Sequence, residues 1–191
     1  MRVSFIACLL LSGWLAGCAG GSSPKPVEAL DERTGVTVGA LKEPIELLPS
    51  AQVAAFESAK HPSFAYLGPV EWNRSGALSY GLWVHIAPGS DVQPGDIHAP
   101  QALTLILDDG PLALTLVEAP RLGHEPYKQV VSWGQTAYFD LSVEALRRMA
   151  ASSKLELTVR AADDSIMNFA PTRDTRGTLT EYLKDRDITR D

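Results

Sequence analysis

Two ladders of alternating leucines, joined by a short turn, constrain the fold of this chain more than any other feature. The ladders are Leu103, Leu105 and Leu107, followed by Leu112, Leu114 and Leu116. Alternation of this kind puts every second side chain on one face of an extended strand. The four residues between the ladders, Asp-Asp-Gly-Pro at 108–111, are typical of a turn. The segment therefore predicts an antiparallel hairpin with one apolar face.

Further extended runs flank this hairpin on both sides. They are residues 35–38, 64–72, 78–86, 130–140, 155–159 and 166–169. Turn residues at 73–76 and 163–165 separate two pairs of these runs and predict two more hairpins. Gly68 and Pro69 predict an interruption within the run 64–72.

Two short helices complete the pattern. The first is expected at 142–151, where Ala145, Leu146, Met149 and Ala150 form one apolar stripe. The second lies near the C-terminus, where Thr178 and Glu181 have the spacing of a capping box and Leu179, Tyr182 and Leu183 would be buried. A short helix at 51–59 is a weaker prediction. The absence of a βαβ rhythm predicts a mainly β fold, an antiparallel β-sandwich (Ig-like or related) with one or two short α-helices.

The N-terminal segment has the three-part layout of a secretory signal. Arg2 is its single charged residue, an apolar run follows from Val3 to Trp14, and small residues close it. The run is too short to cross a bilayer, which takes about 20 apolar residues. We therefore expect cleavage and export.

The residues that close this segment resemble the lipobox of bacterial lipoproteins. They are Leu15, Ala16, Gly17 and Cys18. The resemblance implies that signal peptidase II cuts before Cys18, which then carries a diacylglyceryl thioether and an N-acyl group such as palmitate. Ala19, in place of an aspartate, implies the outer membrane, with the domain in the periplasm. The inner membrane, and an ordinary secretory signal with an incidental cysteine, are the alternatives.

Resemblance beyond the N-terminus is weaker and carries no activity. Residues 31–38 and 66–71 look like segments of uncharacterised proteobacterial lipoproteins. The layout of lipobox, tether and β domain is also similar to that of the small lipoprotein subunit of type VI secretion systems. A shared layout is an analogy at the level of the fold only.

The remaining chain predicts one tethered domain. Residues 1–17 are the signal peptide, 18–32 the lipidated Cys18 and a flexible linker, and 33–191 a single β-sandwich domain. The small, polar and proline residues at 19–26 would reach about 15 Å as a flexible chain. Of the two cysteines, Cys8 leaves with the signal and the sulfur of Cys18 carries lipid. The domain must therefore be stabilised by its core, without a disulfide.

The net charge of the chain argues against nucleic acid as a partner. Its formal net charge is −6 at pH 7, and removal of residues 1–17 makes it one unit more negative. Proteins that bind nucleic acid usually carry a basic face, so nucleic acid is not expected as a partner. The expected partners are the membrane, through the lipid anchor, and an envelope protein. The oligomeric state is left open.

No candidate catalytic or metal-ligating group follows a specific motif. The histidines are His61, His85, His98 and His124, and none has the spacing of a zinc site. Ser79 lies inside an extended run and misses the Gly-x-Ser-x-Gly spacing. Aspartates at 91, 96, 108, 109, 163 and 164 could bind calcium, although turn aspartates more often bond their own backbone. We therefore predict neither a metal nor a cofactor.

Trp83 and His85 are the possible binding residues. They lie on the face of the run 78–86 that is opposite its main apolar face. Either a second layer of chain covers them or they mark an exposed binding patch. The other aromatic residues, Trp72, Trp133, Tyr66 and Tyr80, are expected to pack in the core or across strands.

These observations favour a lipid-anchored envelope lipoprotein whose domain binds or positions another component without catalysis. A partner would use a sheet edge or an aromatic patch. The alternative is a periplasmic hydrolase or small-ligand carrier. That alternative predicts a deep pocket with His85 or His98 beside an acidic residue.

Overall fold

The structure, a computed structural model, describes residues 26–51, 63–87, 89, 99–118 and 125–188. Within them, one antiparallel sheet of eleven strands is accompanied by two helices. The strands are β1 (Pro26–Asp31), β2 (Val36–Leu41), β3 (Ile45–Pro49), β4 (Phe64–Arg74), β5 (Ala77–Ala87), β6 (Pro100–Leu107), β7 (Gly110–Leu114), β8 (Leu116–Val117), β9 (Gln135–Asp140), β10 (Glu156–Ala161) and β11 (Ile166–Pro171). The helices are α1 (Val143–Ala151) and α2 (Arg176–Asp185).

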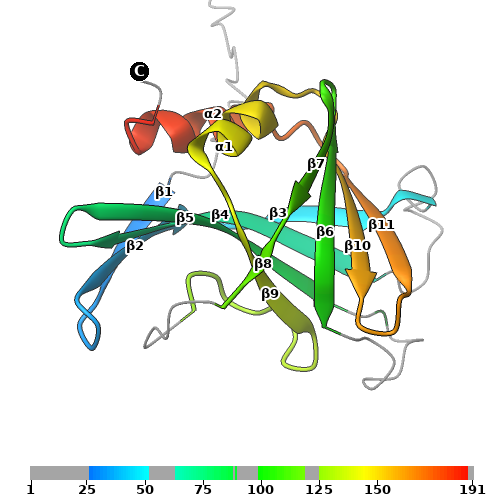
Figure 1. Cartoon of the computed structure of the whole chain (residues 1–191), viewed down its shortest axis with the longest axis horizontal. Coiled ribbons are helices and arrows are strands. Elements are labelled where there is room, and N and C mark those ends of the chain that lie inside the picture. Colours follow the sequence, from blue (N-terminus) through cyan, green and yellow to red (C-terminus); the bar gives the residue numbers. More distant parts are fainter. Residues whose placement is uncertain (1–25, 52–62, 88, 90–98, 119–124, 189–191) are drawn as a thin grey trace, which may run out of the picture.

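The sheet curls until its two edges approach each other, which makes the domain nearly barrel-shaped (Figure 1). The strand order is β7-β6-β10-β11-β3-β4-β5-β9-β8, with β2 attached to β4 and β1 to β2. Thr115 alone separates β7 from β8, and its carbonyl accepts the N–H of Asp140 on β9 at 2.8 Å. The chain therefore passes directly from the β6 edge to the β9 edge. The predicted mainly β, antiparallel class is confirmed, and the sheet is a single curled one.

The hairpin predicted from the leucine ladders is confirmed with a tighter turn. Leu103 pairs with Leu114, and Leu105 pairs with Leu112. Pairing continues to Leu107 and Gly110, so only Asp108 and Asp109 remain in the turn, not the four residues expected. The Asp108 carboxylate accepts the backbone N–H and the hydroxyl of Ser153, which fixes the turn against the segment after α1.

The hairpin of β4 and β5 is also confirmed, but β4 runs through Gly68 and Pro69 without interruption. On its other side, β4 pairs with β3 through Leu67 and with β2 from Val70 onward. The N–H that proline lacks falls where β4 changes partner, so no ladder bond is lost. The Tyr127 hydroxyl donates to the Pro69 carbonyl at 2.7 Å and accepts the Leu41 N–H at 3.0 Å, which bridges this place.

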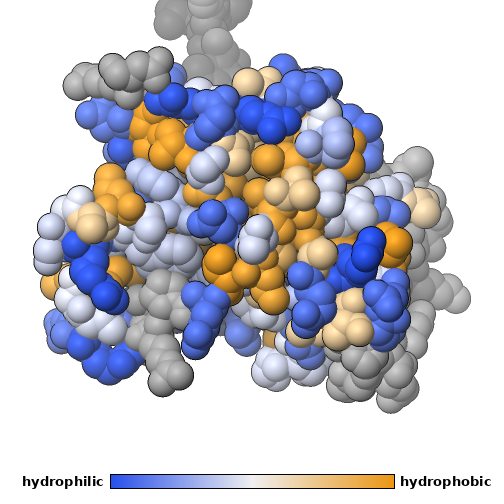
Figure 2. Space-filling model, in the orientation of Figure 1, coloured by the Kyte–Doolittle hydropathy of each residue, from blue (hydrophilic) through white to orange (hydrophobic). Residues whose placement is uncertain are grey.

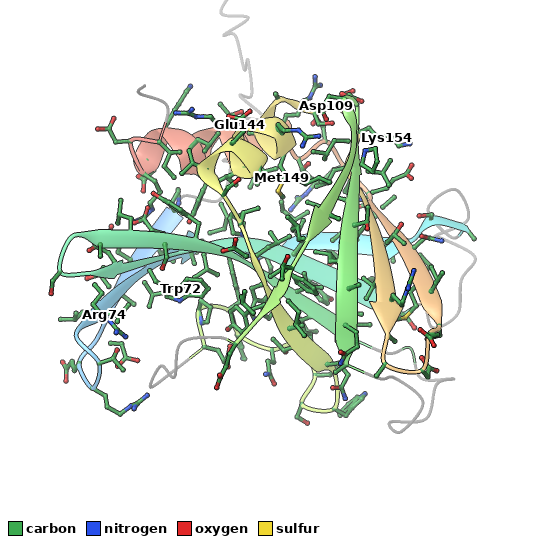
Figure 3. The ribbon with its side chains drawn as sticks, in the orientation of Figure 1. Trp72, Arg74, Asp109, Glu144, Met149 and Lys154 are labelled. Atoms are coloured by element: carbon green, nitrogen blue, oxygen red, sulfur yellow. The ribbon has the colours of Figure 1, made fainter. Side chains whose placement is uncertain are left out.

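The two helices cover one end of the curled sheet (Figure 1). The Ser142 hydroxyl accepts the N–H of Ala145 at 3.0 Å and begins α1 as predicted. Met149 of α1 is fully buried against the interior (Figure 3). The capping box predicted at Thr178 is wrong, because the carbonyl of Thr175 already accepts the N–H of Leu179, so α2 starts earlier. The predicted buried face of α2 is confirmed and contains Leu179, Tyr182 and Leu183.

Apolar side chains from all walls fill the interior between the helices and the far end. Leu47, Leu67, Leu82, Val84, Leu105, Phe139, Leu157 and Phe169 are each no more than 2 % exposed. In the part of the chain that the structure describes, neither helix has the length and hydropathy needed to cross a membrane.

Two predicted boundaries change in the structure. Pro26–Asp31 was expected in the linker 18–32 but forms β1, because the whole strand pairs with β2 from Pro26↔Leu41 to Asp31↔Val36. The extended run predicted at 130–140 is a strand only at Gln135–Asp140. The helix predicted at 51–59 lies almost wholly outside the described residues, and so do the lipobox and the signal segment.

Candidate functional site

Trp83 and His85 do not form an exposed patch, because both side chains are fully buried. They lie on the outer face of the β4–β5 hairpin, where a second layer from residues 125–134 covers them. The Tyr127 ring lies 5.0 Å from the Trp83 ring, and Gly134 packs against the His85 imidazole. Of the two alternatives expected from the sequence, the covering layer is the one observed. Neither residue can contact a partner from this position.

The surroundings of His85 keep its imidazole neutral. Its Nδ1 is 2.8 Å from the Thr136 hydroxyl, and its Nε2 is buried with no hydrogen-bond partner among the described residues. The Trp83 ring stacks on it at 5.6 Å and the Tyr66 ring lies 6.4 Å away. Burial lowers the pKa of His85 because water no longer solvates the imidazolium form. His85 therefore belongs to the packing of the second layer.

The other aromatic predictions divide between buried and exposed positions. Trp72 is 6 % exposed and packs against Tyr138, with ring centroids 6.0 Å apart. Tyr66 and Tyr80 pack against the core as expected. Trp133 is 52 % exposed, so its expected place in the core is wrong. It lies in the covering segment, where Val130 is also exposed.

The remaining sequence candidates that the structure describes do not assemble into a metal site. Ser79 lies inside β5, as predicted, where it pairs with Trp72 of β4. Among the turn aspartates, Asp163 accepts the Ser165 N–H at 3.1 Å within its own turn, whereas Asp108 bonds Ser153 and Asp109 bonds Arg148. Among the described residues, no three His, Cys, Asp or Glu side chains come close enough to hold a metal ion. The other three histidines, the aspartates at 91 and 96, and Cys18 lie outside the described residues.

A buried cation joins α2 to the N-terminal strands. The Arg186 side chain is 4 % exposed, lies against the backbone of Gly39, and pairs with Glu28 of β1 and, at 3.8 Å, with Glu71 of β4. It also donates to the Val27 carbonyl at 3.2 Å. Burial raises the pKa of Glu71, and the Arg186 charge opposes that rise. The start of β1, where the chain enters from its N-terminal segment, therefore lies beside the helical end.

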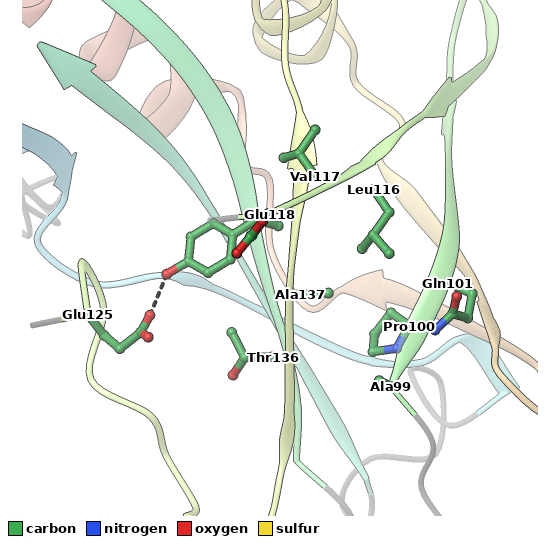
Figure 4. A pocket seen from close by; sticks show the side chains of 10 residues that line it. Ala99, Pro100, Gln101, Leu116, Val117, Glu118, Glu125, Thr136 and Ala137 are labelled. Atoms are coloured by element: carbon green, nitrogen blue, oxygen red, sulfur yellow. Dashed lines mark hydrogen bonds between the residues drawn. The ribbon is translucent and has the colours of Figure 1, made fainter. Parts of the chain in front are cut away.

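A groove lies where the curled sheet remains open (Figure 4). β6 pairs with β7 only from Leu103 onward, and β8 pairs only with Tyr138 and Phe139 of β9. The first residues of β6 and of β9 thus have no strand partner on the sides that face the groove, as far as the described chain extends. The groove between them has a volume of about 520 Å³. This size is within the range of ordinary ligand sites, roughly 300–1,000 Å³.

Backbone edges, apolar side chains and carboxylates line this groove. Residues 99–101 form one wall and residues 136–138 the other, and Leu116 and Val117 of β8 add apolar surface between them. Leu116 is 40 % exposed. Figure 2 shows apolar surface over the crossing of β7 and β8 with β9, flanked by hydrophilic side chains. The groove can therefore hold a mainly apolar segment along its length.

Glu118 and Glu125 give the groove its charge. The Tyr138 hydroxyl donates to a carboxylate oxygen of Glu125 (Figure 4). Burial raises the pKa of Tyr138, and the Glu125 carboxylate raises it further, so the phenol remains a donor at neutral pH. Glu125 is thereby held in one place at the rim, where its charge faces solvent.

The groove and the start of β1 lie at opposite ends of the molecule. β6 and β9 both end near α1: the N–H of Asp108 donates to Ser152, and Asp140 is two residues before Ser142. Their first residues, which line the groove, are therefore at the far end. The length of β6, at about 3.3 Å per residue, separates the two ends by roughly 25 Å.

No protein-family model, curated protein or solved structure matches this chain in comparisons of each kind.

The residues that build the groove were missed by reasoning from sequence. Glu118 and Glu125 carry no local signal, because they meet only after β8 has crossed to β9. Tyr127 and Arg186 were also missed, and each is a polar residue that becomes buried through contacts with distant strands. The only local sequence signal near this covering segment is Tyr127, which follows Pro126. A tyrosine after a proline is not a specific sign of a covering segment.

Proposed function

We propose that this protein is a lipid-anchored envelope lipoprotein whose domain binds or positions another envelope component without catalysis. The groove between β6 and β9 is the observation that carries this proposal. It combines strand edges that are open among the described residues, apolar surface and the fixed carboxylate of Glu125, which is the composition of a surface that holds a protein segment.

The position of the groove supports the same proposal. Cys18 and the tether would enter the domain beside the helices, because β1 starts there. A tether of about 15 Å would hold that end near the membrane. The groove would then face away from the lipid, where a partner can reach it. We further propose a relationship to β-sandwich binding modules, because opposite walls of the sheet face each other across an apolar interior.

Crosslinking in native cells tests this function. The full chain and a Cys18→Ala variant are crosslinked, the membranes are solubilised, and the bound proteins are identified. We expect a stoichiometric complex that depends on Cys18, and membrane release of the variant. Hydrolysis of a cell-wall or lipid substrate, abolished by substitution of one acidic residue or histidine, would instead identify an enzyme.

A further inference from the structure

We propose that the groove takes an extended, positively charged segment of a partner protein, which adds to the sheet as a strand between β6 and β9. This inference rests on the proposed binding function and names the chemistry of the partner at the same groove. The argument comes from strand direction, from the open edges and from charge.

Strand direction makes the groove suitable for one added strand. β7 is antiparallel to β6, and β8 is antiparallel to β9. Because β7 and β8 follow each other along one chain, β6 and β9 run in the same direction. A segment that runs in the direction of β8 would therefore be antiparallel to both walls.

The open edges supply the backbone partners for such a segment. Pro100 and Ala102 of β6 pair with β10 on one side only, with Gln101 at a bulge between them, and Gln135–Ala137 of β9 pair with β5 on one side only, among the residues described. Pro100 offers its carbonyl but no N–H. Strand addition gives affinity through main-chain hydrogen bonds, whatever the side chains. An edge of this kind is otherwise a site of unwanted association.

The side chains of the groove predict the charge of the partner's segment and the alternation of apolar and basic residues along it. Leu116 and Val117 offer apolar contacts, and Glu118 and Glu125 lie at the rim. A strand presents alternate side chains to opposite faces, so apolar residues would face the leucine and valine while basic residues reach the carboxylates. The chain itself has a net charge of −6, which favours a basic partner over a second copy of this chain.

A labelled peptide tests the proposal with the purified full chain in detergent. The probe is Val-Lys-Val-Lys-Val, and its binding is followed by fluorescence anisotropy at low salt. The comparison peptides are Val-Glu-Val-Glu-Val and a backbone N-methylated form of the lysine peptide. We expect only the unmethylated lysine peptide to bind. Amide hydrogen exchange at residues 101–102 and 135–137 should slow when it does.

Variants locate the binding and control for folding. Glu125→Gln keeps an acceptor for the Tyr138 hydroxyl but removes the charge, and Glu118→Gln removes the second charge. We expect the double variant to weaken lysine-peptide binding by at least about fivefold at low salt, with a smaller loss at high salt. Glu144→Gln, at the helical end, is the matched control and should bind as the parent does.

Three results would overturn the proposal. These are equal binding of the N-methylated peptide, equal binding of the glutamate peptide, or unchanged hydrogen exchange at both open edges while the peptide binds. Failure of every peptide to bind would also overturn it. If the native-cell crosslinking still gives a complex that depends on Cys18, the binding function stands and only this choice of partner is wrong.

Discussion

At the scale of single residues, close packing on the outer face of β4 and β5 explains why Gly68 has no side chain. A Cβ at Gly68 would lie 2.3–2.5 Å from atoms of the Tyr127 ring. The tyrosine could move only by giving up its hydrogen bonds to Leu41 and Pro69. Trp83 and Tyr127 therefore pack correctly only over a glycine.

Gly68→Ala should lower the free energy of unfolding by about 1–3 kcal/mol, the usual cost of overpacking a core. Gly177→Ala is the control: its Cβ would meet nothing within 4 Å, and alanine should raise helix stability by up to about 1 kcal/mol. Urea unfolding of both variants measures the difference. Equal stability of Gly68→Ala and the parent would show that Tyr127 does not cover β4 as described.

His85 should make the stability of the domain depend on pH. Burial lowers its pKa in the folded state below the ordinary value of 6.5. The unfolded chain then binds more protons between the two pKa values, so stability is complete above pH 6.5 and falls as the pH drops below it. One proton changes the free energy of unfolding by at most about 1.4 kcal/mol per pH unit.

Urea unfolding between pH 5 and 8, with His85→Asn for comparison, checks this expectation. Among the described residues, the groups that face the imidazole are the Thr136 hydroxyl and the rings of Trp83 and Tyr66, so no carboxylate there offsets the effect. The variant should lose the part of the pH dependence that belongs to His85. Identical slopes for the two proteins would mean that His85 is hydrated in the folded state.

The sequence located these residues on a face but could not say what covers that face. Alternation along β5 placed Trp83 and His85 opposite the main apolar side, which is correct. The covering residues come from a segment more than 40 positions away, and nothing in its own sequence shows which face it covers. Burial of the pair therefore depended on long-range contacts that no local pattern contains.

At the scale of elements, the attachment of α2 to the sheet depends on Arg186 and Glu71. Both side chains are buried, and removal of one member of such a pair leaves the other charge uncompensated. Arg186→Met should therefore lower the free energy of unfolding by about 3 kcal/mol or more. Adding Glu71→Gln to that variant should restore part of the loss, because no buried charge remains.

A double-mutant cycle by urea unfolding measures this coupling. The control is Arg176→Met, which breaks the ion pair between Arg176 and Asp174 at the surface and should change stability little. If the effects of Arg186→Met and Glu71→Gln simply add, the two side chains do not act as a pair.

Local sequence patterns predicted which strands and helices exist better than where each of them begins and ends. All three predicted hairpins are present, because alternation and turn residues are properties of neighbouring positions. The start of α2 was wrong because a capping box can occur inside a helix whose first turn begins earlier. β1 was missed because its own sequence is like that of a linker. It forms a strand only through its pairing with β2 and its contact with Arg186.

At the scale of the whole molecule, the groove follows from how the sheet curls. The pairings of β10 with β6 and of β11 with β3 join segments that are far apart in the chain. The sequence predicted an antiparallel β fold but not these pairings, and therefore not the place where β6 and β9 separate. The groove results from these long-range strand pairings, so no local sequence motif could have predicted it.

The central claim, that a membrane-tethered domain holds a partner in this groove, is tested most directly by site-specific photocrosslinking in native cells. A photoreactive residue replaces Gln101 in the groove or, as the control, Ile166, which is 59 % exposed on the hairpin of β10 and β11. We expect one crosslinked protein from position 101, joined through a segment rich in lysine or arginine, and lost with Cys18→Ala. Equal crosslinking from position 166, or none from position 101, would contradict the claim.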